Sequence, residues 1–402
     1  MILHIDCNTF YASCEVAMHP EMYGKPVVVA NSNEAGGGII LALTKEAKAF
    51  GLKRGNPLFQ VRKIIDDNNI SVFQADLNKY SEISHTLMDA VKEQGIVLNF
   101  RQYSIDEFFG EIPLDDPYKL RFYAEKIKNH IATTTNIPVS CGISLSYTLA
   151  KVATWFAKHY DGYKGICVLP ENKIEIALRR IAIAELWGIG RRSAPKLESR
   201  GIATALDFYN KPAYQIKHLL GINGLRTWQE LHGTPSLEFD DNAQQKSIMH
   251  SRTFAYMTSD IQQLTSYIIE YVAAASQKLR EQHSVCQSIT VFISTNRHRE
   301  DLEQYKSSAT DKMAVPTADT SKIAKTAIQI LKQIFRQGFQ YKKAGIILSD
   351  LTSDDAVQIG LFDTDVQEIK KSRKLMEALD LLNKRFGSNT VKLAAQNSKE
   401  KN

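Results

Sequence analysis

The sequence lacks any apolar run of 18 or more residues, the length that a membrane-spanning helix requires. Its apolar N-terminal stretch breaks at Asp6, which argues against a secretory signal. Its five cysteines are Cys7, Cys14, Cys141, Cys167 and Cys286. They include no Cys-x-x-Cys pair, which argues against a zinc site and a disulfide framework. We therefore expect a protein of the reducing cytoplasm that has no membrane partner.

Length and charge suggest several domains around a polyanion. At 402 residues the chain exceeds what one core usually supports, so two to four domains are expected. Residues 1–150 carry 14 basic against 17 acidic side chains, whereas residues 151–232 carry 13 against 7 and residues 244–345 carry 14 against 8. Two basic regions beside an acidic one suit a protein that holds a polyanion near a metal centre. The alternative is that the surplus of basic side chains only aids solubility.

Three carboxylates stand where apolar segments meet polar ones. Asp6 ends the run at residues 1–5, and the adjacent Asp106 and Glu107 lie in the β-prone segment 102–112. Carboxylates are costly to bury unless they are paired or hold a cation, and Mg²⁺ prefers hard oxygen ligands. The pattern predicts a divalent-metal site. The alternative is that these acids are turn formers, helix caps or solvated surface groups.

The first 170 residues alternate between strand-like and helical patterns, which predicts a sheet covered by helices on one side. The expected strands lie at residues 1–5, 27–30, 38–42, 103–112 and 139–144. The expected helices lie at residues 46–50, 79–94, 121–133 and 149–159. Short helices and Gly turns follow from residue 171.

A Gly-x-Gly turn at Gly188 and Gly190 lies between helical patterns and is followed by Arg191 and Arg192. A looser copy of this pattern occupies residues 218–231. Such a turn leaves backbone N–H groups free to bind phosphate, so the segment resembles a helix-hairpin-helix that holds a nucleic-acid backbone. An ordinary helical hairpin with a Gly C-cap is the alternative.

The second half of the chain predicts a smaller α/β domain. A polar linker is expected at residues 234–245, followed by the order β-α-β-β-α-β over residues 246–349, which suits a ferredoxin-like domain. Its third strand, between residues 303 and 315, is weakly signalled. Arg252, Arg297 and Arg299 are expected on or beside the strands, where a basic face suits phosphates. The tail, residues 350–402, has helical spacing over residues 370–386.

Taken in order, five segments resemble the Y-family of translesion DNA polymerases, most closely its UmuC-type branch (DNA polymerase V catalytic subunit-like, ImpB/MucB/SamB group). They include Asp6-Cys-Asn-Thr-Phe-Tyr-Ala-Ser-Cys-Glu15, Tyr103-Ser-Ile-Asp-Glu107 and Leu186-Trp-Gly-Ile-Gly-Arg-Arg192, with residues 46–51 and 142–158 between them. They spread over nearly all of the first 210 residues.

The resemblance implies an α+β multidomain fold shaped like a right hand. Palm and fingers would occupy residues 1–170, with the fingers at about 20–75, and a helical thumb residues 171–233. The little finger would then be the ferredoxin-like domain at residues 246–349.

The resemblance also implies an error-prone, template-directed DNA polymerase that copies past damaged bases in DNA repair and the SOS response. It assigns Asp6, Asp106 and Glu107, with the Cys7 carbonyl, as ligands of two Mg²⁺ ions. Two such ions activate the primer 3′ hydroxyl and stabilise the leaving pyrophosphate in one in-line step. Primer-template DNA and deoxynucleoside triphosphates are the implied substrates.

Five residues are expected to contact the incoming nucleotide. Tyr11 matches the steric gate that excludes a 2′ hydroxyl, although a core aromatic is the alternative. The backbone N–H groups of Phe10 and Tyr11 are expected to bind the triphosphate. Lys48 and Lys158 match basic contacts to it. Lys45 stands where other members often carry Tyr, which suggests a third phosphate contact.

The resemblance places small residues over the templating base. These are Gly36, Gly37, Gly38 and Ala42. A roof without bulk leaves room for a damaged or mispaired base, so low fidelity is implied. The alternative is that the Gly run is a hairpin turn.

A short motif in the tail, Gln358-Ile-Gly-Leu-Phe362, resembles the peptide by which bacterial polymerases dock onto the sliding clamp. Gln358 would enter one pocket, and Leu361 and Phe362 a hydrophobic one. UmuC-type enzymes are also associated with a recombinase filament and a small accessory subunit, for which no residue here marks a surface.

Two other functions stay open. A nucleotide cyclase also condenses nucleoside triphosphates on a palm-like sheet, but it has no need of two basic domains. A non-catalytic DNA-binding regulator of the clamp would not need all three carboxylates.

Overall fold

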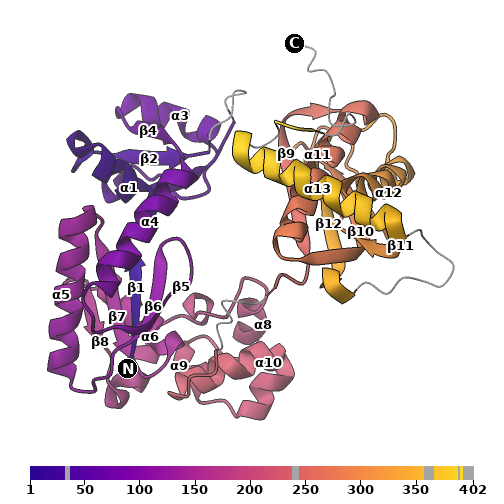
Figure 1. The fold of residues 1–402 in the computed structure, drawn as a ribbon. Helices are drawn as coiled ribbons and strands as arrows, with labels where there is room; N and C mark the ends of the chain where they lie inside the picture. The colour runs from indigo at the N-terminus through magenta and orange to yellow at the C-terminus, as the bar shows by residue number, and fades with distance from the viewer. Residues whose placement is uncertain (32–36, 238–243, 357–365, 388–389, 393–402) are drawn as a thin grey trace. The chain divides into compact units, whose positions relative to one another are not determined.

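The structure is a computed structural model that describes residues 1–402 except 32–36, 238–243, 357–365, 388–389 and 393–402 (Figure 1). The chain divides into two compact units, Met1–Phe239 and Asp240–Asn402, and this division lies inside the segment predicted as a linker. Among the described residues, no helix combines the length and the hydrophobicity that crossing a bilayer requires.

A five-stranded sheet, called the palm sheet below, forms the centre of the first unit in the order β5-β6-β1-β7-β8. Its strands are β1 (Ile2–Cys7), β5 (Leu98–Gln102), β6 (Glu107–Glu111), β7 (Val139–Ser144) and β8 (Ile166–Val168). β1 is antiparallel to both neighbours, whereas β7 and β8 are parallel. The strand expected at residues 103–112 begins only at Glu107, because residues 103–106 form the turn that joins it to β5.

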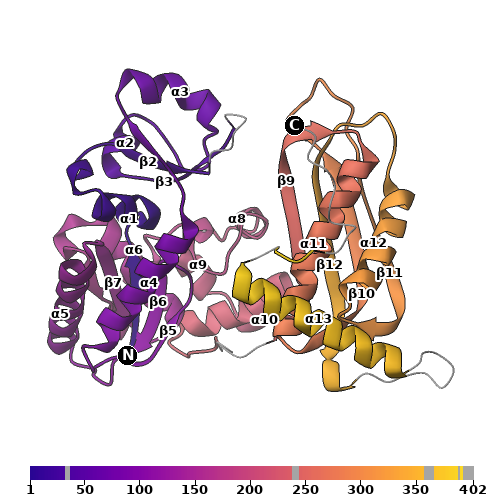
Figure 2. The ribbon, with the colours of Figure 1, turned by 45° about the horizontal axis from the view of Figure 1, so that its top comes forward.

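Helices cover both faces of the palm sheet, so the expectation of one covered side was wrong (Figures 1 and 2). Leu3 and Ile5 of β1 pack into one core with α4 (Leu77–Lys92) and α5 (Pro117–Thr135). His4 faces the opposite side, where α6 (Tyr147–His159) lies. The reason is that successive side chains of a strand alternate between faces. β7 is buried at all six positions, yet Ser140, Gly142 and Ser144 interrupt its apolar residues, so its sequence lacks the continuous apolar run that would indicate two covered faces.

A three-stranded sheet with its own core lies inside the range expected for the fingers. Its order is β3-β2-β4, with β2 (Val27–Ala30), β3 (Ile40–Leu43) and β4 (Ser71–Gln74). Figure 2 shows it with α2 (Lys45–Ala49) and α3 (Leu58–Asp67), which share its core. The chain enters this part from β1 through α1 (Phe10–Met18) and a 3-10 helix at Pro20–Met22.

Short helices follow the palm sheet, as the sequence predicts. They are η3 (Glu171–Lys173), α7 (Ile174–Leu178), η4 (Ile183–Glu185), α8 (Ala194–Glu198), α9 (Ala205–Tyr209) and α10 (Ala213–Leu231), whereas η2 (Asp161–Tyr163) lies before β8. The Gly-x-Gly turn lies between η4 and α8, with Gly188 at φ 90°. In the looser copy, Gly221 at φ 70° breaks α10 into two helices. Glycine is needed at both points because positive φ is costly for other residues.

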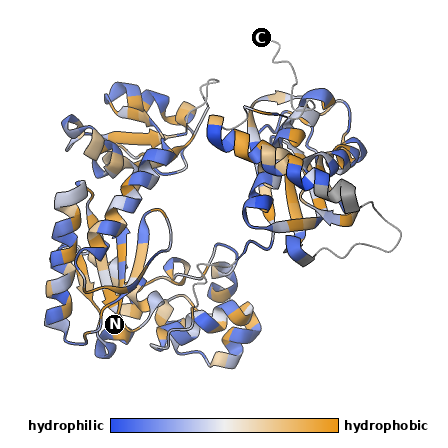
Figure 3. Ribbon diagram, viewed as in Figure 1, coloured by the Kyte–Doolittle hydropathy of each residue, from blue (hydrophilic) through white to orange (hydrophobic). Residues whose placement is uncertain are grey.

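The second unit has the predicted β-α-β-β-α-β order. Its antiparallel sheet, called the little-finger sheet below, has the order β11-β10-β12-β9. The strands are β9 (Ile248–Thr258), β10 (Ser284–Thr295), β11 (Lys306–Thr317) and β12 (Tyr341–Ser353). α11 (Ile261–Glu281) and α12 (Thr320–Ile334) share one core with it, and Figure 3 shows the hydrophobic strands of both units in orange. The weakly signalled third strand is confirmed as β11.

The described part of the tail contains the end of a strand and two helices. β12 extends to Ser353, past the expected end of the domain, and η5 (Asp354–Ala356) follows. The helix expected at residues 370–386 is α13 (Val366–Phe386). It is attached to the little finger by a bidentate ion pair between Asp380 and Arg280 of α11, with distances of 2.5 and 2.7 Å.

Candidate active site

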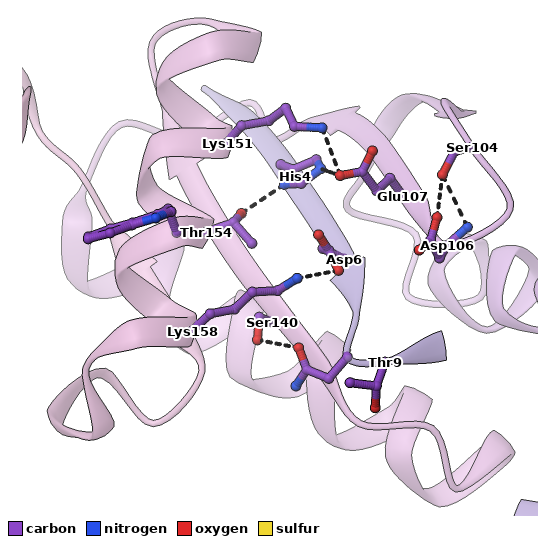
Figure 4. A network of polar contacts seen from close by, with 12 residues as sticks. His4, Asp6, Thr9, Ser104, Asp106, Glu107, Ser140, Lys151, Thr154 and Lys158 are labelled. Carbon is purple, nitrogen blue, oxygen red and sulfur yellow. Dashed lines mark hydrogen bonds and ion pairs between the residues drawn. The ribbon is translucent and has the colours of Figure 1, made fainter. Parts of the chain in front are cut away.

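The three predicted carboxylates lie together at one end of the palm sheet (Figure 4). Asp6 and Glu107 are direct partners across β1 and β6, so their side chains share a face. The Cys7 N–H donates a 2.9 Å hydrogen bond to the Asp106 carbonyl, which fixes the turn before β6 against β1. The Ser104 hydroxyl donates to the Asp106 carboxylate and so holds its orientation.

Two lysines of α6 reach these carboxylates. Lys158 Nζ lies 2.5 Å from an Asp6 oxygen, and Lys151 Nζ lies 2.7 Å from Glu107 Oε1. The two lysines are seven residues apart, so they lie on the same face of the helix. Each ammonium therefore neutralises one carboxylate in a partly buried site.

The electrostatics of the site favour a cation. Burial raises the pKa of Asp6 to about 6, Lys158 opposes this rise, and the nearby Glu107 and Asp106 add to it. Ionised Asp6 is thus poorly stabilised by its surroundings even with a lysine beside it. The structure brings ligand atoms of His4, Asp6 and Glu107 within 4.8 Å of one another, and Asp106 is not part of that group. The carboxylate oxygens of Asp6 and Glu107 are hard donors, which fit Mg²⁺.

His4 belongs to the same face of β1 and was missed from the sequence. Its Nδ1 lies 2.8 Å from the Thr154 hydroxyl, and its Nε2 lies 3.7 Å from Glu107 Oε1. Nε2 is buried without a hydrogen-bond partner among the described residues. Burial, then Lys151 and Lys158, lower the pKa of His4 well below its usual value, so the ring is neutral. Its spacing of two residues from Asp6 was the signal that identifies a shared strand face.

Sequence comparison finds the impB/mucB/samB family in residues 5–155 and the C-terminal domain of that family in residues 245–361. Protein UmuC of Salmonella typhimurium strain LT2 is 33% identical over 397 residues, which span 97% of this chain and 92% of that protein. The chain belongs to the impB/mucB/samB family. Residues 373–402 also match a domain of unknown function, DUF4113.

Other relatives and a solved structure are also similar to the chain over most of its length. Protein MucB of Escherichia coli is 32% identical across 98% of this chain and 93% of its own length. DNA polymerase IV of Oceanobacillus iheyensis is 28% identical across 97% and 90%. A solved chimera of the Y-family DNA polymerases Dbh and Dpo4 has a TM-score of 0.69 at 21% identity, covering 88% of this chain and 99% of that chain. The right-hand fold is confirmed, and the chain is a Y-family DNA polymerase.

Membership of this family decides between the functions that the sequence left open. The nucleotide cyclase is excluded by the family, and the presence of all three carboxylates argues against a non-catalytic regulator. The remaining residues that the Y-family resemblance singled out are found in four places.

Two of the residues predicted to contact the nucleotide lie at the start of α1. Phe10 and Tyr11 are its first residues, so their N–H groups have no acceptor within the helix. Phe10 itself is buried, and its side chain belongs to the hydrophobic core of the palm. Thr9 precedes them at φ 46°, a left-handed conformation that is rare for a β-branched residue. The Tyr11 ring stacks on Tyr80 with centroids 4.8 Å apart.

The two lysines predicted to contact the triphosphate from the fingers are exposed. Lys45 and Lys48 lie on α2, and Lys45 pairs with its neighbour Glu46 at 3.8 Å. Ala42 lies on β3, and Gly37 and Gly38 lie two to three residues before that strand; all three are half-buried. Gly36 lies outside the described residues.

The thumb residues Arg191 and Arg192 are exposed just after Gly190. In the little finger, Arg252 pairs in register with Ala344, whose side chain belongs to the core beneath α11 and α12. Arg252 therefore points toward the helix-covered side of β9. Its role in DNA binding stays a prediction, and the register does not support it.

Arg297 and Arg299 lie in the connection between β10 and β11, beside the strands. Arg299 pairs with Asp301 at 2.5 Å, which offsets its charge. The residues predicted to bind the clamp are Gln358, Leu361 and Phe362, and they lie outside the described residues.

Proposed function

We propose that this DNA-directed DNA polymerase performs translesion synthesis past damaged bases by two-metal-ion nucleotidyl transfer, within DNA repair and the SOS response. The observation that carries the proposal is the convergence of Asp6, Asp106 and Glu107 at the end of the palm sheet, where burial raises the pKa of Asp6. Such a site needs cations to hold its charges together.

Asp6 and Asp106 would be shared ligands of two Mg²⁺ ions, with the Cys7 carbonyl beside them and Glu107 nearest the primer terminus. When bound, the ions activate the primer 3′ hydroxyl and stabilise the leaving pyrophosphate. The protein's task is then to position groups and to supply charge. The pairing of β1 with β6 does this, because it sets Asp6 directly opposite Glu107.

The incoming triphosphate would lie between the start of α1 and Lys158. The N–H groups of Phe10 and Tyr11 provide hydrogen-bond donors at a helix N-terminus, where an anion is favoured. The Lys158 side chain is 31% exposed, so it can turn from Asp6 to a phosphate. Lys45 and Lys48, exposed on the fingers, would add further charge, and Tyr11 would lie under the sugar.

DNA would be held by its backbone in two places. The turn at Gly188 and Gly190, with Arg191 and Arg192, presents N–H groups and positive charge from the thumb. The face of the little-finger sheet opposite α11 and α12 carries no helix of that described core, and Lys343 lies on this face. A structural relative with a TM-score of 0.55 is an insertion ternary complex of Dbh DNA polymerase. It supports the binding of polymerase substrates by this fold.

The proposals for further partners depend only on a sequence motif and on the family resemblance. The motif at residues 358–362 would dock onto the sliding clamp, and a recombinase filament or a small accessory subunit would assist synthesis. Small residues at Gly37, Gly38 and Ala42 would leave room for a damaged templating base, which supports low fidelity.

Primer extension on an undamaged and a lesion-bearing template tests the proposal. Asp106→Ala should abolish extension on both templates, because it removes a ligand that both cations would share, while DNA binding measured by fluorescence anisotropy is retained. Extension by this variant at the wild-type rate would refute the metal assignment.

A further inference from the structure

Lys151 is enclosed by aromatic rings as well as paired with a carboxylate. Its Nζ lies 4.9 Å from the ring centroid of Trp187, 5.0 Å from that of Tyr103 and 5.9 Å from that of Phe109. The same atom lies 2.7 Å from Glu107 Oε1. A cation over aromatic faces is attracted to them, and the attraction grows as water is excluded. The ammonium therefore has a single preferred position.

The three rings belong to different parts of the first unit. Phe109 lies on β6 two residues after Glu107, and Tyr103 lies in the turn that leads to Asp106. Trp187 immediately precedes the thumb turn at Gly188. The rings also contact one another, since Tyr103 and Trp187 are edge to face with centroids 5.4 Å apart. The position of Lys151 is thus fixed relative to the carboxylate turn and to the thumb.

Lys158 provides the contrast on the same helix. Its side chain is 31% exposed, against 17% for Lys151. Lys158 has the freedom to leave Asp6 for a phosphate, whereas Lys151 is held where it is.

We propose that Lys151 is a positioning residue for nucleotidyl transfer, which binds one oxygen of Glu107 and leaves the other facing the cation beside the primer hydroxyl. The proposal rests on the proposed function, because it takes Glu107 as a metal ligand. A single bound oxygen fixes the rotation of the carboxylate, and small errors in such positions are costly in rate.

The Lys151 ammonium has a second effect: it favours the reaction but lowers the affinity for the cation. It places a positive charge beside the carboxylates, so it weakens the binding of a cation to the protein without substrates. Removing the charge should therefore tighten cation binding while it slows the reaction. A residue that only supports the fold would weaken both when it is removed.

Lys151→Met in the full chain tests this, because Met keeps the apolar stem among the rings and removes the charge. Mn²⁺ binding is followed by electron paramagnetic resonance, without DNA or nucleotide. It should tighten about 5-fold or more, because the variant removes one positive charge close to the cation in a partly hydrated site. The kcat of primer extension should fall roughly 10- to 100-fold. The KM for the nucleotide should change by about twofold or less, as for a group that acts only in the reaction step.

Lys158→Met is the matched control, seven residues along the same helix. Lys158→Met should also tighten Mn²⁺ binding. Unlike Lys151→Met, it should raise the KM for the nucleotide. Lys151→Arg should restore most of kcat, since it returns a cation to Glu107. If Lys151→Met does not fold, Trp187→Leu opens one wall around an intact lysine and should lower kcat by a smaller factor with an unchanged KM.

An unchanged kcat or weaker Mn²⁺ binding in folded Lys151→Met would overturn the inference. Failure of the proposed function itself looks different, because Glu107→Gln would then keep wild-type Mn²⁺ binding and extension. Loss of both in Glu107→Gln with a wild-type Lys151→Met would reject the role of Lys151 alone.

Discussion

The palm sheet is covered by helices on both faces, whereas the described helices of the second unit that share a core with the little-finger sheet, α11 and α12, lie on one face of it. In the palm sheet, charged groups lie between strands and α6 and are paired one to one, as with Lys158 and Asp6. On the little-finger sheet, the open face carries hydroxyls and a lysine, including Thr290 and Thr310, which share a 2.7 Å hydrogen bond, and Lys343 near Phe292.

This difference separates two uses of charge. Two unit charges 4 Å apart interact by about 1 kcal/mol in water and about 4 kcal/mol where the effective dielectric is near 20. Partly buried pairs in the palm therefore decide the positions of atoms, and one substitution there should have a large, specific effect. Exposed charges on the little finger should act weakly and add together, as contacts to phosphates do.

Lys158→Ala tests the large effect expected for a partly buried charge in the palm. The variant loses a charged hydrogen bond to the triphosphate, a contact of about 1.5–3 kcal/mol, so the KM for the nucleotide should rise about 10- to 100-fold. Steady-state primer extension at varied nucleotide concentration measures it, with Lys45→Ala, an exposed lysine on the fingers, as the comparison. Equal and small effects of the two variants would mean that the palm lysine has no privileged position.

Asp6→Asn tests the cost of burying charge in the palm. Burial raises the pKa of Asp6 to about 6, above its value of about 3.9 in an unfolded chain. Between these values the native state binds more protons than the unfolded state, so stability falls as pH rises from about 4 to about 6 and stays lower above that range.

Without metal at about pH 7, Asp6→Asn should therefore unfold at a higher temperature than the wild type, and the gap should close near pH 4. Calorimetry in the presence of a chelator measures both. Added Mg²⁺ should stabilise the wild type more than the variant. A variant less stable than the wild type at about pH 7 would show that Lys158 more than offsets the burial of Asp6.

The same contrast explains what could be predicted from the sequence. Asp6, Asp106 and Glu107 were found because each breaks an apolar or β-prone segment, which is a local pattern. His4 and Lys151 were missed because their roles depend on strand pairing and helix packing between segments far apart in the chain. Only the register that places Asp6 opposite Glu107 brings α6 and its lysines to both.

The little finger illustrates the limit in another way. β11 was weakly signalled because it is an edge strand on which polar Lys306, Ser308 and Thr310 alternate with few large apolar side chains. Arg252 was expected to bind DNA, but a strand position faces one side or the other according to a register that sequence alone does not give. Its pairing with Ala344 turns it toward the helices.

Arg252 and Lys343 together provide the test with the smallest expected effect. Both are single positive charges on adjacent strands of the little-finger sheet, and their registers place them on opposite faces. Lys343→Gln should weaken binding to primer-template DNA similarly for all sequences and reduce the slope of log affinity against log salt by about 1, because one phosphate contact is lost. Arg252→Gln, with the same loss of charge, should leave that slope unchanged. Fluorescence anisotropy at several salt concentrations distinguishes the two, and equal slopes would mean that net charge, rather than the open face of the sheet, holds the DNA.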